Sequence, residues 1–120
     1  MLAIMQESHD NILGVQGTGK VTEHDYQNVL IPRMEEILNN YDKARFLYYL
    51  DEGFTGWEAG AMWEDAKFGL RHKNDFDKIA VVGGPKWAAW GTKLVSHFVP
   101  GQVKIFALDE LQAAWEWLES

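Results

Sequence analysis

Apolar residues along the chain fall into short runs that predict five β-strands. Leu2 to Glu7 and Ile12 to Thr18 read as extended segments, and the turn formers of Ser8 to Asn11 between them predict a hairpin. Three further runs have the β-branched and aromatic character of buried strands, namely Arg45 to Leu50, Lys78 to Val82 and Val103 to Leu108.

Between these strands, apolar residues recur at helical spacing. Thr22 is the expected N-cap of the first helix, in which Pro32 predicts a kink or a division into two short helices. Thr55 and Glu58 form an expected capping box for the second helix, and Asp109 and Gln112 form another for the last. The apolar stripe of the second helix is expected to comprise Ala59, Met62, Trp63, Ala66 and Leu70, with Glu64, Asp65, Lys67 and Arg71 facing away from it.

A remaining helix is expected after Gly83-Gly84-Pro85, with Trp87, Trp90, Leu94 and Phe98 on one face. The order is therefore β-β-α-β-α-β-α-β-α. Strands separated by helices imply right-handed crossovers and parallel pairing, while the hairpin makes the first strand antiparallel. We predict one α/β domain over residues 1–120, with a mostly parallel five-stranded sheet and four main helices.

Composition narrows the function. The chain of 120 residues carries a net charge of −7, and its eleven basic residues are scattered, which opposes nucleic-acid binding. It has no cysteine, which excludes disulfides and thiolate metal sites. Neither a signal peptide nor an apolar run long enough to span a bilayer is evident, so we expect a cytoplasmic protein without an integral membrane segment.

The stretch "GVQGTGKV", from Gly14 to Val21, matches most of a phosphate-binding loop. Such a loop needs a hydroxyl after the lysine to hold magnesium, and Val21 has none. We interpret Gly17 and Gly19 as residues that relieve crowding where the strand turns toward the first helix.

Longer stretches resemble a known family. "GTGKVTEHDYQNVLIPRMEEIL", "GWEAGAMWEDAKFGLRHKNDFDKIAVVGGPKW" and "VKIFALDELQAAWEWL" are similar to the SpoIIAA-like branch of STAS-domain proteins, over nearly the whole chain. The resemblance implies a STAS-like fold, related to anti-anti-sigma factors and more loosely to the lipid-binding CRAL-TRIO fold. Known anti-anti-sigma members bind a partner kinase and are switched by phosphorylation of a serine. The corresponding segment here, Asp51 to Gly56, contains no serine, and Thr55 is its one hydroxyl and candidate phosphorylation site.

Ligands of open α/β sheets bind beyond the carboxyl ends of the strands. We expect a binding rim there for a partner protein or a small apolar ligand, formed by Asp51, Thr55, Trp57, Gly83, Gly84 and Trp87. Trp63, Trp90 and Trp115 lie on apolar stripes and are expected in the core. Trp117 lies off its stripe, which leaves it either exposed or at a dimer contact.

The sequence offers no nucleophile with a neighbouring base and no metal-ligand spacing among its four histidines, so we expect no catalytic residue, metal or cofactor. The leading hypothesis is a non-enzymatic binding or regulatory module. A carrier of a lipid-like molecule is the first alternative, with an enclosed apolar cavity as its structural expectation, and a hydrolase or metal enzyme is the second. A homodimer stays open.

Overall fold

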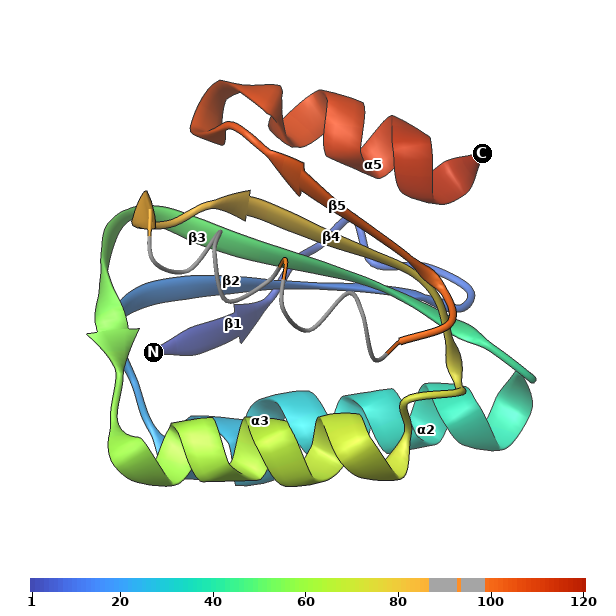
Figure 1. The fold of residues 1–120 in the computed structure, drawn as a ribbon, viewed down its shortest axis with the longest axis horizontal. Helices are drawn as coiled ribbons and strands as arrows, with labels where there is room; N and C mark the ends of the chain where they lie inside the picture. Colours follow the sequence, from blue (N-terminus) through green and yellow to red (C-terminus); the bar gives the residue numbers. More distant parts are fainter. Residues whose placement is uncertain (87–92, 94–98) are drawn as a thin grey trace.

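The structure, a computed structural model, describes residues 1–86, 93 and 99–120. Five strands form one sheet in the order β1-β2-β3-β4-β5 (Figure 1). Strand β1 pairs antiparallel with β2, and β2, β3, β4 and β5 are mutually parallel. The strands span the following residues: β1 Leu2–Ile4, β2 Ile12–Val21, β3 Ala44–Trp57, β4 Phe76–Gly83 and β5 Gln102–Phe106.

Helices cover both faces of this sheet. Helices α2 and α3 lie on one face and α5 lies on the other (Figure 1). Their bounds, with those of the shorter turns, are α1 Glu23–Asp25, the π-helical turn η1 Tyr26–Leu30, α2 Ile31–Asn40, α3 Ala59–Arg71, the 3₁₀ turn η2 Leu108–Glu110 and α5 Leu111–Glu119. The predicted α/β architecture and the antiparallel first strand are confirmed. The helix predicted around Trp87 and Trp90 lies outside the described residues.

The stretch from Gly14 to Val21 is part of strand β2 and not a loop that opens a helix. Gly14 lies directly beneath Trp115 of α5, so that a Cβ at this position would lie 2.5 Å from the indole ring. Gly19 has a φ of 61° and sits at a register shift between β2 and β3. These glycines serve close packing and a bulge, in keeping with a structural role.

The first helical segment begins as predicted. The Thr22 hydroxyl accepts a hydrogen bond from the Asp25 backbone N–H at 3.1 Å, and the Asp25 carboxylate accepts one from the Thr22 N–H at 2.9 Å. The interruption expected at Pro32 takes the form of the π-helical turn η1, whose last N–H, at Ile31, reaches back to the carbonyl of Tyr26. Pro32 then occupies the first turn of α2, where its missing N–H is tolerated.

The prediction that Thr55 caps the second helix is wrong. Strand β3 continues to Trp57, since Gly56 and Trp57 still pair with Lys20 and Val21 of β2. Helix α3 begins at Ala59 after Glu58, which is held at both its backbone and its side chain. The Glu58 N–H donates to the Val21 carbonyl at 2.9 Å, and the Glu58 carboxylate accepts from the Glu23 N–H at 2.8 Å.

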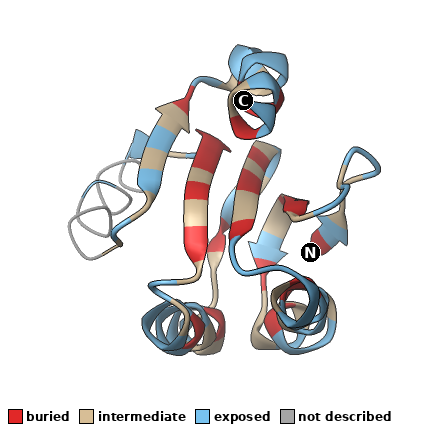
Figure 2. Ribbon diagram, turned by 90° about the vertical axis from the view of Figure 1, so that its right-hand side faces the viewer, coloured by how far each residue is buried: buried red, intermediate tan, exposed pale blue. Residues whose placement is uncertain are grey.

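The face of α3 that turns inward also differs from the prediction. Ala61 and Phe68 are its buried residues, whereas the predicted stripe is largely outside, with Met62, Trp63 and Leu70 exposed by 56%, 64% and 69%. The prediction of a core position for Trp63 is therefore wrong. Burial is concentrated in the strands and in the helix faces turned toward them (Figure 2).

The C-terminal helix differs from its prediction only in its cap. The Glu110 carboxylate, and not the predicted Asp109–Gln112 pair, accepts a hydrogen bond from the Ala107 N–H, at 2.7 Å. Trp115 is buried as predicted. Trp117 is half-buried, with its ring 5.9 Å from that of Phe106 and 5.2 Å from the Lys78 ammonium. Trp90 lies outside the described residues.

The contact between Gly14 and Trp115 gives a test of how α5 packs on the sheet. We expect Gly14→Ala to lower the free energy of unfolding by about 1–3 kcal/mol, because the added methyl group overlaps a buried ring. Chemical denaturation measures the change.

Gly69→Ala is the matched control for this substitution. Gly69 lies inside α3 with open space around the site of a Cβ, so alanine should leave stability unchanged or raise it by about 0.5–1 kcal/mol. Equal losses in the two variants would contradict the proposed packing.

Candidate functional site

The structure brings some residues of the predicted rim together and places others apart. Leu50 of β3 is paired with Gly83 of β4, so Asp51 and Gly83 lie next to each other. A Cβ on Gly83 would lie 2.5 Å from the Leu50 carbonyl oxygen and 2.8 Å from Leu108, which shows how closely these segments approach. Both Gly83 and Gly84 have positive φ, of 76° and 85°, a conformation that glycine adopts without strain.

Asp51 is occupied by hydrogen bonds within the protein. Its carboxylate accepts from the Thr18 hydroxyl, from the Gln16 amide at 2.7 Å and from the Gly53 N–H at 2.9 Å. Partial burial alone would raise the pKa of Asp51, but the hydrogen bonds from Thr18, Gln16 and the backbone outweigh it and lower the pKa. The carboxylate thus ties β2 to β3 at the edge of the sheet.

The other predicted rim residues lie apart from this point. Beyond Leu50, β3 no longer pairs with β4 and bends toward α3 (Figure 1), and it carries Thr55 and Trp57 with it. Thr55 is exposed, whereas Trp57 is half-buried and packs against Phe54, with ring centroids 4.8 Å apart. Trp87 lies outside the described residues. As a binding site, the rim stays a prediction.

Trp57 instead lines an apolar cavity between α3 and the sheet. The cavity has a volume of about 640 Å³ and is lined by residues from η1, α2, α3, β3, β4 and β5. Aromatic and aliphatic side chains make up most of its surface, among them Phe46, Phe68, Phe76, Ile79 and Val103. Asp51, Thr55, Gly83 and Gly84 do not line it.

A chain of polar atoms lies within this apolar cavity. The Trp57 indole N–H donates to the Tyr48 hydroxyl at 2.9 Å, and the Tyr48 and Tyr26 hydroxyls are hydrogen-bonded to each other at 2.9 Å. Burial raises the pKa of both tyrosines, so both hydroxyls stay protonated at neutral pH. Tyr26 in turn interacts with the carboxyl of Asp65.

Asp65 is the functional candidate that the sequence analysis missed. It lies between Ala61 and Phe68 on the face of α3 that turns inward, and not on the outer face as predicted. Asp65 is exposed as a residue, so its carboxyl is accessible from the cavity. Desolvation by the surrounding protein atoms raises the pKa of Asp65, and the Tyr26 hydroxyl offsets only part of the effect. The spacing of Ala61 and Phe68 was the available signal, but the larger Met62 and Trp63 favoured a different stripe.

The chemistry that the cavity offers is limited. Its described polar groups are the two tyrosine hydroxyls, the Trp57 indole, the Asp65 carboxyl and the Lys73 ammonium. Within the described part of the chain, no three His, Asp or Glu side chains lie together as metal ligands would. The arrangement favours binding of an apolar molecule that carries a small polar group.

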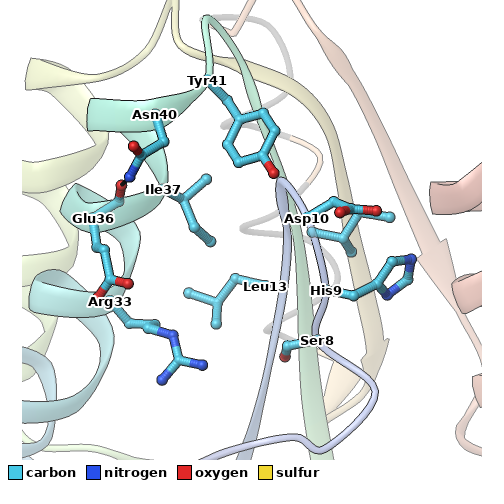
Figure 3. A pocket seen from close by; sticks show the side chains of 10 residues that line it. Ser8, His9, Asp10, Leu13, Arg33, Glu36, Ile37, Asn40 and Tyr41 are labelled. Carbon is cyan, nitrogen blue, oxygen red and sulfur yellow. Dashed lines mark hydrogen bonds between the residues drawn. The ribbon is translucent and has the colours of Figure 1, made fainter.

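A second pocket, of about 520 Å³, lies between the turn at Ser8 to Asp10 and helix α2 (Figure 3). Arg33 and Glu36 of α2 and Asp10 of the turn bring charges of both signs to it, and all three side chains are exposed. Such a site remains well hydrated, so burial there would contribute less binding energy than in the apolar cavity.

Comparisons with known proteins agree with this architecture. The family model described as SpoIIAA-like matches residues 12–119. The chain belongs to the SpoIIAA-like family. No functionally curated protein matches the sequence.

A solved structure supports the assignment to the SpoIIAA-like family. The chain is similar to an uncharacterised protein of the DUF3478 family with a SpoIIAA-like fold from Shewanella loihica PV-4, at 30% identity and a TM-score of 0.78. The match covers 98% of this chain and 93% of that one. Proteins of the SpoIIAA-like fold are in general binding or regulatory modules and not enzymes. Among the described residues, no helix has the length and apolar character to cross a bilayer.

Acidification tests the role of Asp51. Because its pKa is lower in the folded than in the unfolded state, its contribution to stability is present above about pH 4 and is lost as the pH falls through the folded pKa. We expect Asp51→Asn to reduce the free energy of unfolding by about 1 kcal/mol at pH 7, with the difference from wild type shrinking below about pH 4. Denaturant titrations at several pH values measure it, and Glu52→Gln, at an exposed neighbour, serves as control.

The tyrosine pair in the cavity can be tested with a single hydroxyl deletion. Tyr48→Phe removes the acceptor of the Trp57 N–H and the partner of Tyr26, and we expect a loss of about 1–2 kcal/mol in the free energy of unfolding. Tyr49→Phe is the control, because the Tyr49 hydroxyl makes no hydrogen bond within the described part of the chain. A loss of similar size in both variants would show that the pairing contributes nothing specific.

Proposed function

We propose that this SpoIIAA-like protein is a non-enzymatic binding module that takes a small apolar molecule into the cavity between α3 and the sheet. The observation that carries the proposal is the cavity itself, about 640 Å³ in volume and lined mostly by apolar side chains. Pockets of roughly 300–1,000 Å³ that combine an apolar lining with few polar groups are typical of small-molecule sites.

The exposed apolar side chains of α3 support the same proposal. Met62 and Leu70 line the cavity and are nevertheless more than half exposed. Because they adjoin the apolar cavity, these side chains extend the apolar surface that a ligand could cover. An apolar ligand in the cavity would bury part of both side chains, and it would gain roughly 25 cal/mol for each Å² removed from water.

The proposal joins the two expectations drawn from the sequence. It keeps Trp57 as a binding residue, and it favours the carrier of a lipid-like molecule. The expectation for such a carrier was an enclosed apolar cavity, whereas the cavity found is apolar but open to solvent. The described lining includes no serine, threonine, cysteine or histidine, and binding needs no such group.

Recognition of a partner protein at the rim is the second candidate. It is favoured by the exposure of Thr55 on the bent end of β3, where the hydroxyl is accessible to a modifying enzyme. Phosphorylation at Thr55 would add negative charge next to the exposed Glu52 and Gly53 segment and would change the surface that a partner meets. Mass spectrometry of protein isolated from its source tests for this modification.

A neutral lipophilic dye tests the main proposal. We expect N-phenyl-1-naphthylamine to bind with one dye per protein and to gain fluorescence as it leaves water. Ala66→Trp places a bulky ring on the cavity wall and should weaken the dye by about tenfold or more, since loss of a buried apolar contact area of this kind amounts to at least about 1.4 kcal/mol.

Lys67→Trp is the matched control. Lys67 is the next residue of α3, is exposed and does not line the cavity. It should leave dye binding unchanged. Saturable binding that is equally strong in both variants would place the dye elsewhere, and absence of saturable binding would contradict the proposal.

A further inference from the structure

Among the described polar groups of the cavity, the Asp65 carboxyl forms no ion pair. The Trp57 N–H already donates to Tyr48, and Tyr48 and Tyr26 share a hydrogen bond. The Asp65 carboxyl lies close enough to Tyr26 to interact with its hydroxyl, so a chain of hydrogen bonds from Trp57 through Tyr48 and Tyr26 can end at Asp65. In this arrangement the Trp57 N–H and both tyrosine hydroxyls donate to groups of the protein itself.

Asp65 retains most of its capacity to accept hydrogen bonds. An ionised carboxylate has about four acceptor positions, and the Tyr26 hydroxyl can use only one of them. Within the described part of the chain, no lysine, arginine or histidine forms an ion pair with Asp65. Asp65 lies on the cavity side of α3 between Ala61 and Phe68 and is exposed there, so a ligand in the cavity can reach its carboxylate. A perturbed carboxyl in a cleft is a recognised sign of a ligand site.

We propose that the cavity selects amphiphiles with a protonated amine as the polar head, with the ammonium group bound at Asp65 and the alkyl or aryl part against the apolar wall. This inference rests on the proposed function and adds the class of ligand. The ammonium supplies both the hydrogen-bond donors and the positive charge that the site lacks. A fatty acid would bring a second anion to Asp65 and would be repelled.

Lys73 is the one described cation that lines the same cavity, and it does not occupy this place. Helix α3 advances by about 9 Å from Asp65 to its end at Arg71, and Lys73 lies beyond that end. Lys73 is also exposed, so water satisfies its ammonium group. It leaves Asp65 free to bind the ligand's head.

Competition among three ligands of equal chain length tests the proposal in the unmodified protein. Decylamine, decanol and decanoate are titrated, below their aggregation limits, against bound N-phenyl-1-naphthylamine. We expect decylamine to displace the dye at concentrations about tenfold or more below those needed for decanol, because a hydrogen bond to a charged partner is stronger than one to a neutral partner, and decanoate to be the weakest. This ranking does not depend on how any variant folds.

Two variants then locate the preference. Asp65→Asn should remove the advantage of decylamine while leaving decanol within about twofold. Glu64→Gln removes the same charge from the neighbouring position, which does not line the cavity, and should leave the ranking unchanged. Lys73→Gln shows whether decanoate is held by the ammonium group.

The outcomes separate this inference from the proposed function. If decanol displaces the dye but decylamine is no better, or if Asp65→Asn keeps the preference, the amine assignment is overturned while the apolar site stands. Decanoate binding that is strongest and depends on Lys73 would overturn it in favour of an anionic head. If no ligand displaces the dye, the cavity is not an amphiphile site and both proposals fail.

Discussion

Strand β3 continues from Asp51 to Trp57 beyond its last pairing with β4, and among the described strands this overhang pairs with β2 only. The chain then has a single residue, Glu58, before α3 begins, and Glu58 is hydrogen-bonded to both Val21 and the first turn of α1. With so short and so constrained a connection, the helix has little freedom to rotate about its own axis. The end of the overhang therefore decides which residues of α3 meet the sheet.

The orientation of α3 brings a few polar groups into an otherwise apolar cavity. Asp65 comes to lie on the inward face between Ala61 and Phe68, opposite the buried hydroxyls of Tyr26 and Tyr48. The two hydroxyls satisfy each other and the Trp57 N–H, which removes most of the cost of burying them. The Asp65 carboxyl forms no ion pair within the described part of the chain, and the proposed preference for an ammonium head rests on this residue.

The sequence predicted the fold well because each strand and helix carries its own local pattern. The β-branched run of "KIAVV" and the capping pair of Thr22 and Asp25 specify their structure without reference to distant residues. The start of α3 could not be predicted in this way. Thr55 followed by Glu58 has the form of a capping box, but pairing of Gly56 and Trp57 with β2 competes for the same residues and prevails. The inward face of α3 was also mispredicted, because the large apolar side chains of Met62 and Trp63 favoured a stripe that leaves Asp65 on the surface. The candidate site is thus set by a long-range ladder that no local pattern reveals.

The same overhang explains why Thr55 and Trp57 differ in surroundings although they are two residues apart. In a regular strand they would share a face, and Phe54 would lie on the opposite face from Trp57. Here Phe54 and Trp57 contact each other, and Thr55 is exposed. Gly56 lies between them with a φ of 135°, a conformation that other residues rarely adopt, and this breaks the alternation. The break directs the Trp57 indole toward Tyr48 and into the cavity. A residue with a Cβ at position 56 would be strained in that conformation, and relaxing the strain toward a regular strand would turn the indole away from Tyr48. The cavity wall formed by Trp57 therefore depends on a glycine that does not itself contact the cavity.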